Sequence, residues 1–283
     1  MQLGVNVPNF GPGTDPGVLR RWAQTVEGLG FDLLMVSDHV AVTPDVAQQY
    51  PAPFYEPFTT LSWLAGITDR VRLGTTVLVA PYRHPLLVAR MAANLNDLSG
   101  GRLVLGVGVG WAQQEYAALG VDFAQRGRLT DELLDVLRAA WADDGDYRNG
   151  RIPIWVGGNS DAGIRRAVRH AAAWHPLRFS LPWLRDAVER LTATAATAGR
   201  PVPELVPRIL LRLTDAPVPD EDRSAGEGTI EQIADDLQQL WQLGAATVVL
   251  DPFGGDPDET HHPETAWRAL AAVADLRPRT ELS

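Results

Sequence analysis

Apolar runs of strand length alternate with segments of helical period along almost the whole chain, and this alternation constrains the fold more than any other feature. The runs are rich in valine and leucine, as in parallel strands that are buried on both faces. Between them, apolar side chains recur every three to four residues, which is typical of helices packed on a sheet. Eight runs are predicted as strands: Leu3–Val7, Leu33–Val36, Leu73–Val79, Leu103–Val109, Ile154–Val156, a sixth near Trp174, Leu205–Leu213 and Thr247–Leu250.

Eight strand and helix pairs within 283 residues have the size and order of a (β/α)8 barrel, the TIM-barrel fold. A doubly wound open sheet is the alternative, although it usually has fewer strands per domain. No linker, charge block or internal repeat divides the chain, so residues 1–283 are predicted to form a single domain. In a barrel, the loops that follow the strands build the active face. Loops are expected at Thr43–Pro57, Gly110–Gly127, Ala142–Pro153 and Thr214–Gly228, of which the first two follow strands.

The composition removes several chemistries, because all 25 basic residues are arginines and cysteine is absent. Without lysine the chain can form no Schiff base, and without cysteine it has no thiolate nucleophile, thiolate zinc site or disulfide. The net charge of −10 argues against nucleic-acid binding, which needs a basic face. No secretory signal and no apolar stretch of membrane-spanning length are found, so we expect a cytoplasmic protein without a membrane partner.

Ser37-Asp38-His39 ends the second predicted strand and is the first candidate site. A histidine beside a carboxylate at a strand end is suited to proton transfer, since its ordinary pKa lies near neutrality. The alternative is a capping aspartate next to a hydrogen-bonded histidine that serves only the structure. Another candidate is Leu73-Gly74-Thr75-Thr76-Val77 with the following Tyr82-Arg83-His84-Pro85, where the threonine hydroxyls can bond a ligand or can simply favour the strand.

Two glycine-containing segments are candidate cofactor contacts. Gly106, Gly108 and Gly110 lie on one face of the fourth strand, where they leave room for a flat group or allow close packing inside the barrel. This is no dinucleotide fingerprint, because Trp111 stands where a third glycine is required. The segment 157–160 runs into a helix that carries Arg165 and Arg166, and it suits a phosphate or an ordinary helix cap.

Metal binding is not predicted. The adjacent histidines His261 and His262 lie in a stretch rich in proline and acidic residues, which favours a solvated loop over a metal site.

Seven motifs, in a fixed order, resemble the luciferase-like monooxygenase superfamily, and within it the coenzyme F420-dependent oxidoreductases of actinobacteria. The likeness covers most of the chain. Its markers are Pro8-Asn9-Phe10-Gly11, Val36-Ser37-Asp38-His39, Phe54-Tyr55-Glu56-Pro57, the segment 70–77, Leu98-Ser99-Gly100-Gly101-Arg102, the segment 105–111 and Ile154-Trp155-Val156-Gly157-Gly158.

The resemblance implies a deazaflavin site at the strand ends. His39 matches the family's acid/base residue, and Asp38 matches its neighbour beside the ring. Thr76-Val77 matches a bulge with a cis peptide that backs the ring. Glu56 and Trp111 are expected in the substrate pocket. Glu56 and Glu115 are the rivals of His39 as the proton-transfer group, although the sequence shows no interaction partner for either carboxylate. The other implied cofactor contacts are Gly108, Val109, Gln114, Gly157, Gly158, Asn159, Ser160 and Gly163.

The sequence departs from the family pattern in three places. Trp111 stands where sugar-phosphate dehydrogenases of the superfamily carry a catalytic glutamate, so their substrate and mechanism are not carried over. The chain is shorter than its relatives between Trp141 and Ile154. Ala172-Ala173 replaces the usual Asp-Gly before the aromatic residue of the sixth strand.

The favoured function is an F420-dependent oxidoreductase that transfers a hydride between the deazaflavin and a small organic substrate while His39 moves a proton. His39 is expected beside walls of glycine and aliphatic residues. The alternatives are an FMN-dependent luciferase-like monooxygenase and a barrel that has lost its cofactor and acts as a binding protein. A homodimer is expected from the resemblance and from nine tryptophans, some of which should lie at an interface.

Overall fold

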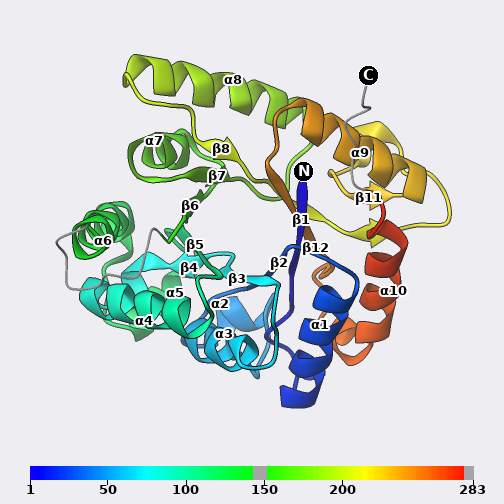
Figure 1. The fold of residues 1–283 in the computed structure, drawn as a ribbon, viewed down its shortest axis with the longest axis horizontal. Coiled ribbons are helices and arrows are strands. Elements are labelled where there is room, and N and C mark those ends of the chain that lie inside the picture. The colour runs from blue at the N-terminus through cyan, green and yellow to red at the C-terminus, as the bar shows by residue number, and fades with distance from the viewer. Residues whose placement is uncertain (143–151, 277–283) are drawn as a thin grey trace.

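The strands form a parallel ring with the helices around it (Figure 1). The computed structural model describes residues 1–142 and 152–276. Seven strands of the ring occupy predicted positions: β1 (Gln2–Asn6), β2 (Leu33–Val36), β3 (Arg72–Thr75), β5 (Leu103–Gly108), β6 (Ile154–Gly157), β7 (Ala173–His175) and β12 (Thr247–Asp251).

The segment between β7 and β12 closes the ring. It contains β8 (Glu204–Leu205) and β9 (Arg208–Leu210). Leu205 pairs with Trp174 on one side and forms a parallel bridge with Ala245 on the other, so the segment is bonded to both neighbours. β9 then pairs with β12 in parallel. The predicted (β/α)8 barrel is therefore confirmed.

The predicted seventh strand, Leu205–Leu213, is interrupted in the structure. Pro207 separates β8 from β9, because proline has no N–H to donate to a strand ladder. Beyond Leu210 the chain leaves the ring, and β10 (Arg212–Leu213) pairs with β11 (Glu227–Gly228) in a separate two-stranded sheet.

The predicted third strand, Leu73–Val79, is also broken. β3 ends at Thr75, the peptide bond between Thr76 and Val77 is cis, and β4 (Leu78–Val79) resumes the pairing with β5. We call residues Thr76–Val77 the bulge. The N–H of Thr76 donates to the carbonyl of Val36 at 2.8 Å, and the N–H of Val79 donates to Asp38 at 2.9 Å. The start of the bulge is thus held by β2, and the strand β4 that follows the bulge is held by Asp38.

Two apolar layers hold the barrel together. Leu33, Met35, Trp155 and Val249 belong to one cluster inside the ring, because alternate strand residues point inward. The larger cluster joins the outward strand residues to the helices. The helices are α1 (Pro16–Gly28), α2 (Pro44–Ala47), α3 (Pro57–Ala65), α4 (Pro85–Leu98), α5 (Gln113–Ala118), α6 (Arg126–Ala140), α7 (Asp161–His170), α8 (Leu181–Thr197), α9 (Ile230–Gln242) and α10 (Pro263–Val273), with 3₁₀ turns η1 (Ala80–Tyr82), η2 (Phe123–Gln125), η3 (Asp220–Asp222) and η4 (Pro257–His261).

Three of the predicted loops contain regular structure. The loop after β2 includes α2, the loop after β5 includes α5 and η2, and the loop 214–228 includes η3 and β11. Most of the fourth predicted loop, Ala142–Pro153, lies outside the described residues, as does most of the segment expected to be shorter than in relatives.

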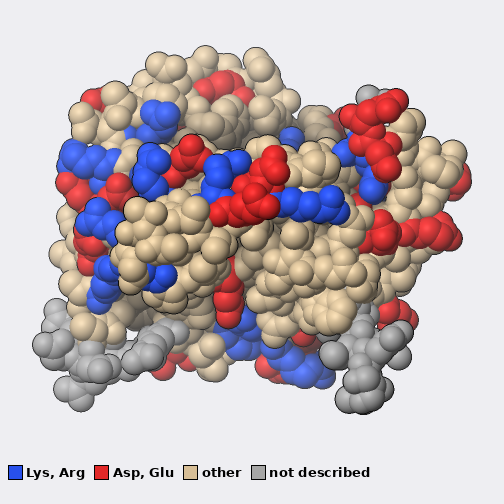
Figure 2. Space-filling model, turned by 90° about the horizontal axis from the view of Figure 1, so that it is seen from above, with Lys and Arg blue, Asp and Glu red and all other residues tan. Residues whose placement is uncertain are grey.

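The outer surface mixes charges of both signs. On the face shown in Figure 2, basic and acidic side chains lie among one another and form no continuous basic area. Within residues 1–142 and 152–276, no helix is both long and apolar enough to cross a membrane.

Candidate functional site

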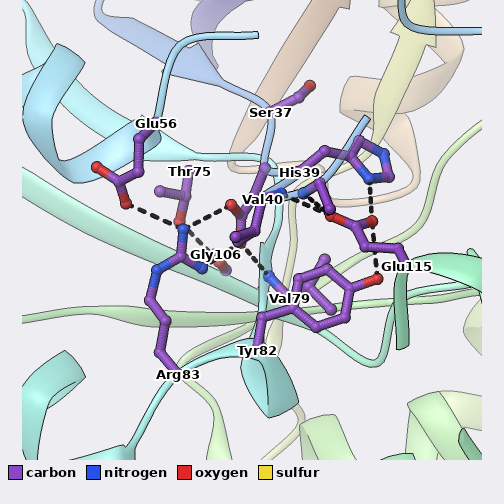
Figure 3. A network of polar contacts seen from close by, with 12 residues as sticks. Ser37, His39, Val40, Glu56, Thr75, Val79, Tyr82, Arg83, Gly106 and Glu115 are labelled. Atoms are coloured by element: carbon purple, nitrogen blue, oxygen red, sulfur yellow. Dashed lines mark hydrogen bonds and ion pairs between the residues drawn. The ribbon is translucent and has the colours of Figure 1, made fainter. Parts of the chain in front are cut away.

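A buried histidine and glutamate form the centre of the site. His39 directly follows β2, and Glu115 lies on α5, after β5. Nδ1 of His39 lies 2.6 Å from Oε2 of Glu115, and the two side chains are 6% and 0% exposed (Figure 3). Because a carboxylate only accepts hydrogen bonds, the proton must sit on Nδ1. Nε2 is therefore the ring nitrogen left to act on another group.

Glu115 is held as a carboxylate by four donors. Its Oε1 accepts the N–H groups of Val40 at 2.6 Å and Ala41 at 2.9 Å, and its Oε2 also accepts the hydroxyl of Tyr82 at 2.9 Å. Burial alone would raise the pKa of Glu115, but the His39 ring and the two N–H groups outweigh it and hold the pKa below its usual value. Burial and the neighbouring Glu115 raise the pKa of Tyr82, which keeps its proton and remains a donor.

Aromatic rings surround His39, in place of the expected glycine and aliphatic walls. The rings of Tyr50, Phe54 and Trp111 have centroids 5.5, 5.3 and 5.7 Å from the imidazole. Phe10 also packs against Tyr50 and Phe54, so the loops after β1, β2 and β5 contribute to one cluster. The earlier expectation failed because these rings come from loops whose folding the strand pattern does not specify.

Asp38 is engaged by an arginine of the segment Tyr82-Arg83-His84-Pro85, which follows the third predicted strand. Arg83 donates to both of its carboxylate oxygens, at 2.7 and 2.8 Å, and also to Glu56 at 3.0 Å (Figure 3). Burial raises the pKa of Asp38, and the guanidinium opposes this effect. Asp38, which also accepts the N–H of Val79, thus fixes the end of β2 to β4. Glu56, at the start of α3, joins Asp38 on the same guanidinium group.

A second polar network lies beneath the bulge. His175, at the end of β7, is buried, and its Nε2 lies 2.9 Å from Oγ1 of Thr76 while Nδ1 donates to the carbonyl of Val206. Complete burial lowers the pKa of His175 to about 4, so the ring is neutral near pH 7. Arg208 donates to the carbonyl of Thr76 at 2.9 Å and pairs with Asp251 at 2.6 Å.

The glycines of β5 and β6 make room for the bulge. A Cβ on Gly108 would overlap the Cγ2 methyl group of Val77. A Cβ on Gly157 would lie 2.8 Å from the Cγ1 methyl group of the same valine. A Cβ on Gly106 would overlap the carbonyl oxygen of Thr75. Close packing, which was the alternative interpretation of this glycine strand, therefore accounts for Gly106 and Gly108. Val77 itself is half-buried, with its methyl groups against Gly108 and Gly157.

The turn from β6 into α7 has the geometry of a helix-start anion site. Gly158 has φ +119°, which side chains rarely adopt, and the space beside it is open. Ser160 caps the N–H of Gly163 at 3.2 Å, and Asn159 exchanges two hydrogen bonds with the backbone of Leu177. The N–H groups of the first helical residues, beginning at Asp161, have no intrahelical acceptor, as at any helix start.

The arginines beside this turn differ in their availability. Arg166 pairs with Asp131 at 2.7 Å, so its charge is already compensated. Arg165 is exposed on the second turn of α7.

The predicted residues fall into two groups at one end of the barrel. His39 and Trp111 are in ring contact, and Glu56 joins Asp38 through Arg83. The second group is centred on Val77, which lies between Gly108 and Gly157, next to Thr76. The peripheral residues lie at the edges: Val109 accepts the hydroxyl of Tyr116 through its carbonyl, and Gln114 is exposed with its N–H on Asp45.

Sequence reasoning missed three residues of the site and misjudged a fourth. No local pattern marks His175, Arg208 or Asp251, although His175 and Asp251 are the last residues of β7 and β12, which is a usable signal in a barrel. Glu115 was taken as a rival of His39, whereas the structure makes it the partner of His39.

Sequence comparison identifies relatives across most of the chain. The family model described as luciferase-like monooxygenase matches residues 1–224. An uncharacterised protein of Mycobacterium tuberculosis is 32% identical over 180 residues, which cover 54% of this chain and 62% of that protein. The phthiodiolone/phenolphthiodiolone dimycocerosates ketoreductase of the same organism is 28% identical over 272 residues, covering 76% of this chain and 71% of the ketoreductase.

Solved structures share the fold at low sequence identity. One is an F420-dependent secondary alcohol dehydrogenase in complex with an F420–acetone adduct, with a TM-score of 0.76 at 18% sequence identity. The alignment covers 96% of this chain and 98% of the dehydrogenase chain. The oxygenating constituent of 3,6-diketocamphane monooxygenase from Pseudomonas putida, in complex with FMN, has a TM-score of 0.75 at 15% identity, with coverage of 100% and 99%.

Proposed function

The chain belongs to the luciferase-like monooxygenase family, and from that premise we propose that it is an F420-dependent oxidoreductase in which His39 moves the proton. Members of this family are oxidoreductases and monooxygenases. The observation that carries the proposal is the buried His39–Glu115 pair, which lies at the strand ends next to the bulge and leaves Nε2 of His39 free to act.

The residues present fit a flat ring system that carries a phosphate. Val77 offers a half-buried aliphatic surface, and the open side of Gly158 lies just before the start of α7, where a helix attracts an anion. Arg165 is the exposed cation beside that turn. When bound there, a deazaflavin would supply or accept the hydride.

The chain's own groups handle the proton. Reduction of a carbonyl group needs a hydride on carbon and a proton on oxygen, and oxidation of an alcohol releases both. Nε2 of His39 donates or accepts the proton, while Glu115 holds the ring in one tautomer and one orientation. The rings of Tyr50, Phe54 and Trp111 pack around the imidazole and leave little of it exposed to water.

An FMN-dependent monooxygenase is the second candidate, because the P. putida relative of similar TM-score holds FMN. Both cofactors need the same slot and the same phosphate turn. The F420-dependent dehydrogenase and the mycobacterial ketoreductase favour the hydride-transfer reaction, with a carbonyl compound or an alcohol as the substrate.

A binding titration tests the choice of cofactor. The purified protein is titrated with oxidised F420 and, separately, with FMN, and tighter binding of F420 is expected. Affinity should fall as salt is raised, because the phosphate turn must attract an anion to a chain of charge −10. Equal or tighter FMN binding would favour the monooxygenase, and binding of neither cofactor would favour the barrel that has lost its cofactor.

We further propose that the protein forms a homodimer. The expectation that tryptophans lie at an interface finds little support. All nine lie in the described residues, and Trp111, at 44% exposure, is the one among them that is largely exposed. The support is family resemblance together with exposed Leu86 and Leu87 on the first turn of α4. Sedimentation at micromolar concentration tests it, and a monomer there would refute it.

A further inference from the structure

A groove of about 650 Å³ lies between α7 and α8, which are neighbours in Figure 1. It begins at Asp161, the first residue of α7, directly after the turn from β6. Val168 forms a buried part of its wall, and the small side chains Ala193 and Thr194 of α8 leave the space between the helices unfilled. Four arginines and one aspartate line it, so positive charge is concentrated here on a chain of net charge −10.

The four arginines of the groove are available to a ligand. Among the described residues no hydrogen bond or ion pair engages Arg165, and Arg200 donates to the backbone carbonyl of Arg169 at 2.6 Å. Arg169 and Arg190 each pair with an aspartate, at 3.6 and 3.4 Å, but every side chain in these two pairs is at least 43% exposed. Exposed ion pairs contribute little to stability, so a ligand of higher negative charge can displace both aspartates.

The arginines form a row with a regular spacing. Arg165 and Arg169 are four residues apart on α7, which places them on one face with Cβ atoms roughly 5 to 6 Å apart. The bond from Arg200 to the carbonyl of Arg169 holds a third guanidinium group beside the end of the same helix. Guanidinium groups bind carboxylates and phosphates through paired hydrogen bonds. The row therefore suits several anionic groups in sequence better than it suits a single ion.

We propose that this groove binds an extended polyanion whose carboxylate or phosphate groups follow one another at about the spacing of a helical turn. The groove is separate from the His39–Glu115 pair, and its binding of anions does not depend on the proposed reaction.

Two sources have this chemistry. One is a free solute, such as a polyphosphate or an oligocarboxylate. The other is the charged tail of a cofactor bound at the turn before α7, because Arg165 lines the groove and also stands beside that turn. F420 carries such a tail, a chain of γ-linked glutamates, whereas FMN ends at its phosphate. This second source rests on the proposed function.

The first test titrates the protein without cofactor with tri-γ-glutamate and, separately, with inorganic tripolyphosphate, by calorimetry. Arg169→Gln combined with Arg200→Gln should weaken the binding of both probes about 10- to 100-fold, because two charge-assisted contacts are lost. The double variant should fold, since both side chains are exposed and the carbonyl of Arg169 keeps its bond from Arg138 at 3.0 Å. Wild-type affinity should also fall as salt is raised from about 50 to about 300 mM.

Arg128→Gln combined with Arg185→Gln is the matched control, because it removes the same charge from two exposed arginines outside the groove. Its affinities should equal those of the wild type. Equal losses in the two double variants would show a general effect of net charge and overturn the proposal. Failure of the wild type to bind either probe at low salt would also overturn it, as would inorganic phosphate binding as tightly as tripolyphosphate.

A second titration distinguishes the two sources and separates this proposal from the proposed function. It uses forms of F420 that differ only in the number of glutamates. If the tail occupies the groove, affinity should rise with tail length in the wild type but not in Arg169→Gln/Arg200→Gln, and FMN should bind both proteins equally. If a free solute occupies it, tail length should have no effect, and tripolyphosphate should still bind when F420 is saturating. Failure of every form of F420 to bind would refute the proposed function, while the first test would still decide whether the groove binds polyanions.

Discussion

Two histidines at the same end of the barrel occupy opposite environments. His39 follows β2, pairs with the carboxylate of Glu115 and packs among aromatic rings at the rim. His175 ends β7 inside the ring, where its partners are a hydroxyl and a carbonyl and its nearest charge is the cation Arg208. Burial beside a cation disfavours a protonated ring, which keeps His175 neutral. The same residue type is thus suited to proton transfer in one place and to a neutral structural role in the other.

This difference predicts that replacing His39 affects chemistry. His39→Asn should lower turnover by about 10² to 10⁴, the range for loss of one general acid or base, and leave cofactor affinity within a few-fold. Steady-state kinetics and a cofactor titration check it. Full turnover combined with lost cofactor binding would make His39 a binding residue, and Glu56 would be the next candidate for the proton.

His175 should affect stability in acid. The folded chain keeps this ring neutral down to about pH 4, whereas the unfolded chain takes up the proton near pH 6.5. Protonation therefore favours unfolding, and stability is lost as pH falls through this window, by about 3 kcal/mol in total. Urea unfolding at pH 7 and at pH 4.5 measures the loss as a difference in the free energy of unfolding. The His175→Gln variant should lack the part of that difference that comes from His175. His261→Gln, which changes an exposed histidine, should keep it.

Glu115→Gln tests whether the partner sets the tautomer of His39. The amide can donate toward Nδ1, which would move the ring proton to Nε2, so turnover should fall about 10- to 10²-fold. The ring ¹⁵N shifts of His39 should change from the Nδ1–H form to the Nε2–H form. Unchanged turnover with an unchanged tautomer would contradict the role given to Glu115.

Glu56→Gln should have the smallest effect. The Glu56 side chain is 38% exposed, and Asp38 keeps both of its bonds to Arg83 without it. Stability should change by at most about 1 kcal/mol and turnover by less than about threefold. A loss of turnover as large as that of His39→Asn would show that Glu56, and not the His39–Glu115 pair, handles the proton.

The local pattern predicted the barrel and the position of His39, because both depend on periods of two and 3.6 residues and on where a strand ends. The bulge at Thr76–Val77 came from family resemblance alone, since nothing in the strand Leu73–Val79 marks a break. Neither the local pattern nor the family resemblance identified the side chains that bond His39 and His175. Glu115 is 76 residues from His39, and Thr76 is 99 residues from His175.

The sequence by itself therefore determined the element order, the buried faces and the end of the barrel that carries the chemistry. Only the tertiary structure decided that Glu115 holds His39, that Arg83 occupies Asp38 and that His175 remains neutral. The physical reason is that inward or outward direction is a local property of a strand. Which side chains meet depends on ring closure, which brings together strands and loops far apart in the chain.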